Sequence, residues 1–278
     1  MTATRPLDPG RTWDSAVESW REGRSMAFLR AYSDAVNRAL LDAWLPAASA
    51  GRVLKTDLFD EAVGAGLVPA LRRHAAEVVA IDISPSVVER ARQRYPGLAA
   101  YEADTRRLPF PDASFDVVVS NSTLDHFARR DDIADALAEL NRVLKPGGRL
   151  LLTLDNAVNP LVRLRNALPG SLVRSTGLVP YPIGATCGPV QLRRLLEDSG
   201  FELEAERALM HFPRIAARAA AALARSDSPG LLRAVMAFER LGNGPTRYLT
   251  GQFVAASARK GLPPRGAGRP AGEPCRRS

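Results

Sequence analysis

The residues with the clearest chemical potential in this chain of 278 residues are carboxylates that follow short apolar segments. Asp57 and Glu61 come after the first such segment. Asp82 ends the second segment, and Asp104 follows the third. Ionised carboxylates accept hydrogen bonds and attract cations. The spacing therefore predicts a binding site for a ligand that offers hydroxyl or amino donors and carries positive charge.

The segments that would position these carboxylates alternate between strand and helix patterns. The central run, Phe115–Ser120, is short, apolar and β-branched, as expected of a strand buried on both faces of a parallel sheet. Other strands are expected at 51–54, 78–82, 149–154, 201–208 and 248–258. Helices are expected at 25–44, 67–76, 85–95, 131–144, 189–199, 212–225 and 229–241. Ser25 and Ser84 are expected N-caps, and Gly200 is expected to end the helix before it. This alternation predicts an α/β fold with its ligand site at the carboxyl ends of the strands.

The composition is that of an ordinary globular protein, because 46% of the residues are hydrophobic and 24% are charged. The net charge is +8, but residues 259–278 hold six basic groups against one acid and contribute +5 of it. A nucleic-acid footprint belongs on the folded domain, so nucleic acid is not an expected partner. Cys187 and Cys275 suggest neither a disulfide framework nor a metal site. With no apolar leader and no run of 18 apolar residues, a cytoplasmic location is expected.

Three stretches carry a resemblance to a known family. They are LPFPDASFDVVVS at the fourth strand, VVAIDISPSVVERAR at the second strand and LAELNRVLKPGGRLLLT at the fifth strand. Residues 51–201, together with the last strand, resemble the class I S-adenosylmethionine (SAM) methyltransferases of the methyltransferase type 11-like kind. The resemblance implies a Rossmann-like sheet of seven mostly parallel strands with helices on both faces. It also implies SAM as the cofactor.

The resemblance implies roles for the carboxylates that follow the second and third strands. Asp82 would accept hydrogen bonds from both ribose hydroxyls, and Asp104 would accept one from the exocyclic amine of adenine. The alternatives are that Asp82 caps the helix starting at Pro85 and that Asp104 is a turn residue. Three further positions are implied as cofactor contacts: Ile83, Thr105 and Asn121.

The loop after the first strand departs from the family pattern. An acid followed by a glycine-rich turn is usual there, but this chain has the sequence KTDLFDEA, with glycines only at Gly64 and Gly66. One hypothesis is a rebuilt loop, in which Asp57, Asp60 or Glu61 faces the cationic groups of SAM and Gly64 allows close approach. The other is a decayed site that binds SAM weakly or not at all. The rebuilt loop is favoured, because these carboxylates suit a cationic ligand and would repel dinucleotide phosphates.

The acceptor side is expected on the loops after the fourth and fifth strands. His126 is the one histidine placed to act as a base for a hydroxyl or an acidic carbon. The alternative is that His126 caps or packs at the entry to the next helix. Three residues are expected to contact the acceptor: Asp125, Asn156 and Tyr181.

The expected layout is a lead over residues 1–24, a methyltransferase domain over 25–258 and a disordered basic tail over 259–278. Helical lid insertions are expected within the domain, at 156–188 and 209–247. The arginine-bearing helix 212–225 has a mostly alanine apolar side, so a peripheral membrane contact is not favoured.

The expected function is methyl transfer from SAM to a small molecule, such as a specialised metabolite, a sugar or a lipid-like compound. The alternative is a non-catalytic relative that binds a partner as a scaffold or regulator. The sequence leaves the acceptor and the oligomeric state open.

Overall fold

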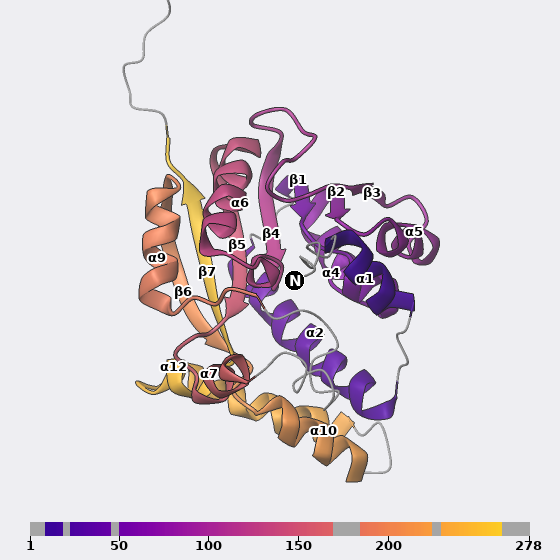
Figure 1. Ribbon diagram of the computed structural model, residues 1–278, viewed down its shortest axis with the longest axis vertical. Helices are drawn as coiled ribbons and strands as arrows, with labels where there is room; N and C mark the ends of the chain where they lie inside the picture. The colour runs from indigo at the N-terminus through magenta and orange to yellow at the C-terminus, as the bar shows by residue number, and fades with distance from the viewer. Residues whose placement is uncertain (1–8, 19–22, 46–49, 169–183, 224–228, 263–278) are drawn as a thin grey trace, which may run out of the picture.

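The computed structural model describes residues 9–18, 23–45, 50–168, 184–223 and 229–262. Its core is a seven-stranded sheet with the strand order β3-β2-β1-β4-β5-β7-β6 (Figure 1). The strands are β1 (Ala50–Lys55), β2 (Ala75–Asp82), β3 (Ala99–Glu102), β4 (Phe115–Asn121), β5 (Leu144–Asp155), β6 (Phe201–Leu209) and β7 (Phe253–Lys260). Strands β1 to β5 pair in parallel, and β7 is antiparallel to both of its neighbours. The expected Rossmann-like sheet of seven mostly parallel strands is confirmed.

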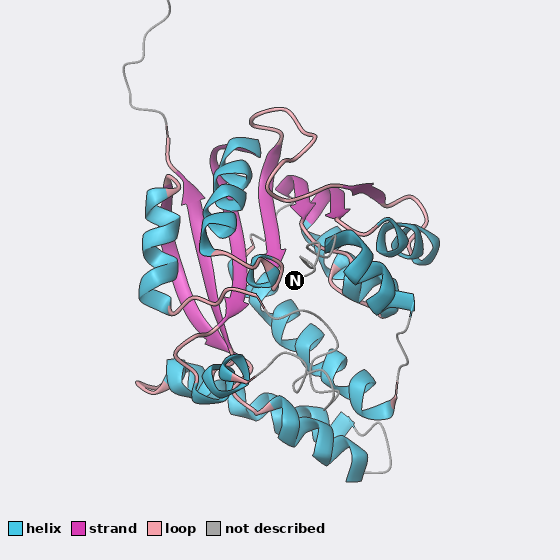
Figure 2. Ribbon diagram, viewed as in Figure 1, coloured by secondary structure: helices cyan, strands magenta, loops and turns pink. Residues whose placement is uncertain are grey.

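Helices cover both faces of this sheet (Figure 2). The helices packed on it include α2 (Arg24–Trp44), α3 (Phe59–Val63), α4 (Val68–His74), α5 (Pro85–Arg94), α6 (Arg130–Val143) and α9 (Pro189–Asp198). On β4, Val118 packs with side chains of α6 and α9, whereas Val117 and Val119 pack with those of α2, α4 and α5. Each valine buried in this way stabilises the fold by about 1.5 to 3 kcal/mol. Burial on both faces explains why the middle of β4, Val117 to Val119, is apolar without alternation.

Two of the three predicted helix-end signals are confirmed. Ser84 caps α5, because its hydroxyl accepts a hydrogen bond from the Val87 N–H at 3.1 Å. Gly200 has φ +80°, a left-handed conformation that glycine adopts without strain, and it follows the end of α9. The prediction for Ser25 is wrong: α2 begins at Arg24, and Gly23 occupies the N-cap position without a side-chain cap.

The N-terminal lead contains a helix that the sequence analysis does not anticipate, α1 (Pro9–Glu18). It is tied to the start of α5 by Asp14, whose carboxylate accepts from the Ser84 hydroxyl at 2.5 Å and from the Ser86 N–H at 3.2 Å. Arg90 of α5 donates to the Val17 carbonyl at 3.0 Å. These contacts hold α1 across the carboxyl end of the sheet near β2.

The two expected insertions contribute helices below the sheet, as oriented in Figure 1. The first insertion forms α7 (Pro160–Ala167). The second forms α10 (Arg214–Leu223), α11 (Pro229–Met236), the 3-10 helix η2 (Ala237–Asn243) and α12 (Arg247–Thr250). The second of the two helices expected in this insertion is therefore split, and the end of its expected range is a 3-10 helix. Helices α10 and α11 pack on α2.

Strand β7 is displaced from its expected range. Tyr248 lies in α12 rather than at the strand start, and the strand runs on to Lys260. Arg259 is paired with Glu204 at 2.7 Å, so it belongs to the sheet and not to a basic tail. Residues 263–278 lie outside the described part of the chain. Among the described residues, no helix is long and apolar enough to cross a membrane.

Candidate functional site

A cavity of about 660 Å³ lies where strands β1 to β5 end. Its walls come from α1, α2, the loops after the strands and the first turn of α10. This is the edge at which open α/β sheets bind ligands, because the loops after the parallel strands diverge there. The cavity therefore has the position expected from the sequence.

One end of the cavity lies beside β2, where Asp82 and Ile83 line it. The two oxygens of Asp82 each accept one backbone hydrogen bond, from Leu58 N–H and from Ser84 N–H, both at 2.9 Å. A carboxylate oxygen has capacity for a second bond, so both oxygens can still accept from a ligand. Asp82 thus supports the start of α5, as the alternative holds, and also borders the cavity.

Burial raises the pKa of Asp82 to about 7, although its backbone hydrogen bonds oppose the rise. Between pH 4 and 7 the folded protein then holds more protons at this residue than the unfolded chain does. Stability therefore falls as pH rises through this window, by at most about 1.4 kcal/mol per pH unit.

We expect the melting temperature of the wild type to fall relative to Asp82→Asn between pH 4 and 7, and the difference to stay constant above pH 7. Thermal melts of both proteins across this range measure the effect. If the melting temperatures of the two proteins instead change in parallel between pH 4 and 7, Asp82 does not titrate in this window.

The next carboxylate, Asp104, also lines the cavity and is held by Arg106. The Arg106 side chain donates to both carboxylate oxygens, at 2.6 to 3.1 Å, and also pairs with Asp132 at 2.8 Å. Burial alone would raise the pKa of Asp104, but the hydrogen bonds from Arg106 hold it below its ordinary value. Thr105 is nearly buried beside it and lines the same wall. Asp104 therefore stays ionised and fixed in orientation at the cavity.

The loop after β1 is organised around Lys55, whose side chain is buried. Its ammonium lies 2.9 Å from the Asp57 carboxylate and 3.0 Å from that of Glu61, and it donates to the Asp57 carbonyl at 2.7 Å. Asp57 and Asp60 line the cavity, as the rebuilt-loop hypothesis requires. The buried ammonium of Lys55 therefore compensates part of the negative charge of this loop.

Two residues expected at the cofactor, Glu61 and Gly64, do not line the cavity. Glu61 is fully buried, and one carboxylate oxygen accepts from the N–H groups of Leu67 and Val68 at the start of α4. Gly64 instead faces the guanidinium of Arg30, because a Cβ at Gly64 would lie 1.5 Å from an Arg30 nitrogen. Glu61 pairs with other parts of the protein and Gly64 makes room for Arg30, so neither residue lines the cavity where their cofactor contacts are predicted.

The last residue of β4, Asn121, and His126 from the loop after it both line the cavity, as expected. The Asn121 side-chain oxygen accepts from the Thr153 hydroxyl at 2.9 Å, which fixes its orientation. His126, on the 3-10 helix η1 (Leu124–His126), meets Trp13 edge to face, with ring centroids 4.9 Å apart. Trp13 also meets Phe59, at 5.4 Å. Helix α1 therefore adds an aromatic wall that the sequence analysis misses.

The predicted acceptor contacts Asp125 and Asn156 are not at the cavity either. Asp125 is buried, and its carboxylate accepts from the Ser122 hydroxyl at 2.9 Å and the Asp155 N–H at 3.0 Å. Asn156 is fully buried and donates to the carbonyls of Tyr248 and Gly251, at 2.8 and 2.9 Å. Both fasten loops to one another beneath the site, and neither side chain lines the cavity. Tyr181 lies outside the described residues.

We expect Asn156→Ala to lower the free energy of unfolding by about 2 kcal/mol, because buried carbonyls lose their donor. Urea denaturation measures this loss, and the exposed Asn166→Ala serves as the control. A variant of normal stability that binds the acceptor poorly would instead place Asn156 at the acceptor site.

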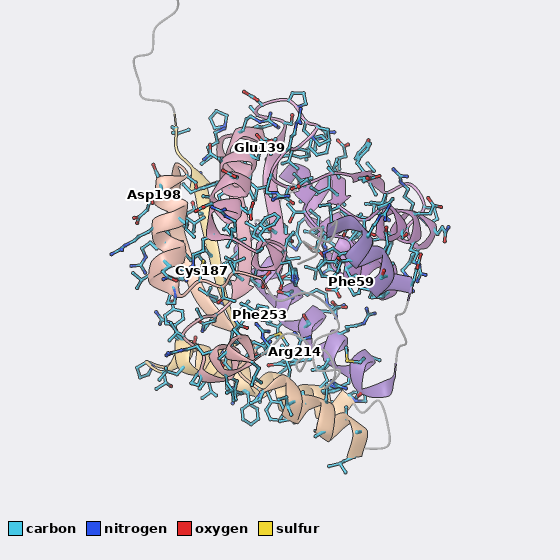
Figure 3. The ribbon with its side chains drawn as sticks, in the orientation of Figure 1. Phe59, Glu139, Cys187, Asp198, Arg214 and Phe253 are labelled. Carbon is cyan, nitrogen blue, oxygen red and sulfur yellow. The ribbon has the colours of Figure 1, made fainter. Side chains whose placement is uncertain are left out.

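Away from β2, apolar side chains line the cavity together with polar ones, among them Arg30 of α2 and Arg214 of α10. Six side chains from α2, the end of β6 and the start of β7 line it: Met26, Leu29, Val36, Leu209, Met210 and Phe253. Figure 3 shows Phe59, Phe253 and Arg214 at the end of the sheet that faces α10. Sequence reasoning misses these residues, because their periodicity is also that of an ordinary core. The cavity thus joins a carboxylate-lined end to an end where apolar side chains gather.

Comparison with known proteins finds methyltransferases similar to this chain in sequence and in fold. Residues 60–152 match the family model described as "Methyltransferase domain". A probable S-adenosylmethionine-dependent methyltransferase of Mycolicibacterium smegmatis is 32% identical over 151 residues, covering 54% of this chain and 52% of the relative. A demethylmenaquinone methyltransferase of Chlorobaculum tepidum is 36% identical over 160 residues, covering 52% of this chain and 65% of the relative. The chain thus spans about half the length of the first of these curated relatives and about two thirds of the second.

A solved structure gives the same result for the fold. An S-adenosylmethionine-dependent methyltransferase of Mesorhizobium loti superposes with a TM-score of 0.56 at 20% identity, covering 82% of this chain and all of that one. The family match begins at residue 60, after the unusual loop has started, and ends within β5. These findings support a place for the chain in the class I S-adenosylmethionine-dependent methyltransferase family, and its fold is that of these enzymes.

Proposed function

We propose that this protein transfers the methyl group of SAM to a small-molecule acceptor. The observation that carries the proposal is the single cavity in which Asp82 and Asp104 line one end and apolar side chains line the other. A nucleoside with two ribose hydroxyls and an adenine amine suits the first end, because Asp104 is ionised, Asp82 is mostly ionised above about pH 7, and ionised carboxylates only accept hydrogen bonds. The apolar end leaves space for a second molecule beside the cofactor.

The residues present fit SAM as the cofactor. Both Asp82 oxygens retain acceptor capacity, and Asp57 and Asp60 supply negative charge for a cationic ligand. When bound, SAM supplies the electrophilic methyl group. The protein's part is then to hold the acceptor in line and to exclude water. Three more lining residues complete the proposed cofactor contacts: Ile83, Thr105 and Asn121.

His126 is the proposed base on the acceptor side. It lines the cavity on the loop after β4, where its ring is held against Trp13. An acceptor hydroxyl or acidic carbon must lose a proton as it gains the methyl group, and an imidazole can take that proton near neutral pH.

The acceptor we propose is a compound with an apolar body, which among the expected classes favours a lipid-like or aromatic molecule over a sugar. Burial of apolar surface against these walls contributes a binding free energy of about 25 cal/mol per Å². A sugar would instead lose hydrogen bonds to water there. The relative from Chlorobaculum tepidum is named for a quinone-type acceptor, which has this character.

The test is turnover of SAM to S-adenosylhomocysteine with a panel of acceptors. The panel pairs apolar quinols and phenols with sugars of similar size, and a reaction without acceptor gives the background rate. We expect product above background with an apolar member. Failure to bind SAM and to form product with any acceptor would overturn the proposal.

A further inference from the structure

The unusual loop after β1 raises the question of which groups hold the amino-acid end of the cofactor. A glycine-rich turn would present bare backbone, but here Leu58 is fully buried and its N–H already donates to Asp82 at 2.9 Å. The Thr56 N–H likewise donates to the Val119 carbonyl at 3.1 Å. These two backbone donors of the loop are therefore committed to the protein, which favours side chains as the groups that hold the amino-acid end.

The acids of the loop differ in what they face. Glu61 is directed into the protein, and Asp57 is paired with the buried Lys55 at 2.9 Å. Asp60 lines the cavity from the first turn of α3. Of these three acids, Asp60 lines the cavity and also lies close enough to Arg30 and Arg214 to feel their charges.

Arg30 and Arg214 line the same part of the cavity and act electrostatically on Asp60. Burial and the neighbouring Asp57 raise the pKa of Asp60, while Lys55, Arg30 and Arg214 oppose that rise. Arg30 is anchored in the protein, because it donates to the Val63 carbonyl at 2.8 Å and lies against Gly64. Arg214 stands at the first residue of α10, at the cavity wall.

We propose that Asp60 and Arg214 together hold the amino-acid end of the cofactor, with Asp60 accepting from its ammonium and Arg214 donating to its carboxylate. The inference rests on the proposed function. It follows from the charges of the ligand, because a zwitterion taken out of water needs both of its charged groups paired and hydrogen-bonded. A guanidinium matches a carboxylate in a two-point geometry that lysine cannot copy.

This assignment gives the insertion between β6 and β7 a second role. Its helix α10 carries Arg214 to the cofactor, while Leu209 and Met210, just before it, line the apolar end. One insertion therefore contributes to both halves of the cavity.

The experiment compares two ligands by calorimetry on the full chain. S-adenosylhomocysteine carries the amino-acid end, and 5′-methylthioadenosine is the same nucleoside thioether without it. We expect Arg214→Met and Asp60→Asn each to weaken S-adenosylhomocysteine binding about tenfold to a hundredfold, and to leave 5′-methylthioadenosine binding within about twofold. Arg218→Met, one turn further along α10 and outside the cavity lining, is the matched control and should change neither affinity.

Three results would overturn the inference. One is unchanged S-adenosylhomocysteine binding in both variants. Another is an equal loss for both ligands, which would mean that the two residues only support the fold. A third is a wild type that binds both ligands equally well. The site would then recognise only the nucleoside part of the cofactor, and the proposal that it binds SAM would be unaffected. A wild type that binds neither ligand would instead overturn the proposed function itself.

Discussion

Replacing Lys55 with methionine is expected to lower the free energy of unfolding by about 3 to 5 kcal/mol, the effect of removing one partner from a buried ion pair. Burial disfavours the charged form of Lys55, but the carboxylates of Asp57 and Glu61 raise its pKa above the ordinary value. Without the ammonium, Glu61 would be a fully buried carboxylate with no counter-charge at 3.0 Å. The loop and the start of α4 should then lose their anchor.

Urea denaturation followed by circular dichroism measures this loss. Lys145→Met is the matched control, because Lys145 is 45% exposed in its pair with Asp116 and should contribute less than about 1 kcal/mol. The double variant Lys55→Met, Glu61→Gln should regain part of the stability, since it removes the stranded charge as well. A single variant as stable as the wild type would show that Lys55 is not the organising charge of this loop.

Asp82→Ala is expected to weaken S-adenosylhomocysteine binding by about 3 kcal/mol or more, which is over a hundredfold. The carboxylate would otherwise accept from two ribose hydroxyls, and each charge-assisted bond contributes roughly 1.5 to 3 kcal/mol. Because 5′-methylthioadenosine has the same ribose, its affinity should fall equally, in contrast to the result expected for Arg214→Met.

Asp82→Asn separates this binding role from the structural one. The asparagine keeps the shape and one oxygen, so it can still accept from one of the N–H groups of Leu58 and Ser84. We expect it to fold and to bind both ligands less well than the wild type. A folded Asp82→Asn protein with wild-type affinity for both ligands would remove Asp82 from the ribose site.

Much of the fold could be predicted because its signals are local. In the run Phe115–Ser120, the three successive valines Val117 to Val119 indicate a strand covered on both faces, and helices do pack on both faces. Ser84 and Gly200 act within one helical turn of their own positions. Asp82 and Asp104 could be placed at the cavity because the carboxyl ends of parallel strands meet at one edge.

The rest of the site depends on pairings that a linear sequence does not display. Four polar side chains beside strand ends were equally able, by their chemistry, to bind the ligand: Asp57, Glu61, Asp125 and Asn156. Only the fold shows that Glu61 meets Lys55 and that Asn156 meets the carbonyls before β7. Trp13 lies on α1, before the strands that carry the carboxylates, and Arg214 lies on α10, after them. No local sequence pattern therefore indicates that these two residues line the cavity.

We propose that the cavity takes an adenosyl cofactor with a cationic sulfur rather than a dinucleotide. Calorimetric titration of the wild-type chain with S-adenosylhomocysteine, with SAM as competitor and NAD as comparison ligand, tests it directly. We predict saturable one-to-one binding with a dissociation constant well below about 1 mM, displacement by SAM and no binding of NAD, whose phosphates the loop carboxylates would repel. No saturable heat with S-adenosylhomocysteine at millimolar concentration, or binding of NAD with equal affinity, would contradict the claim.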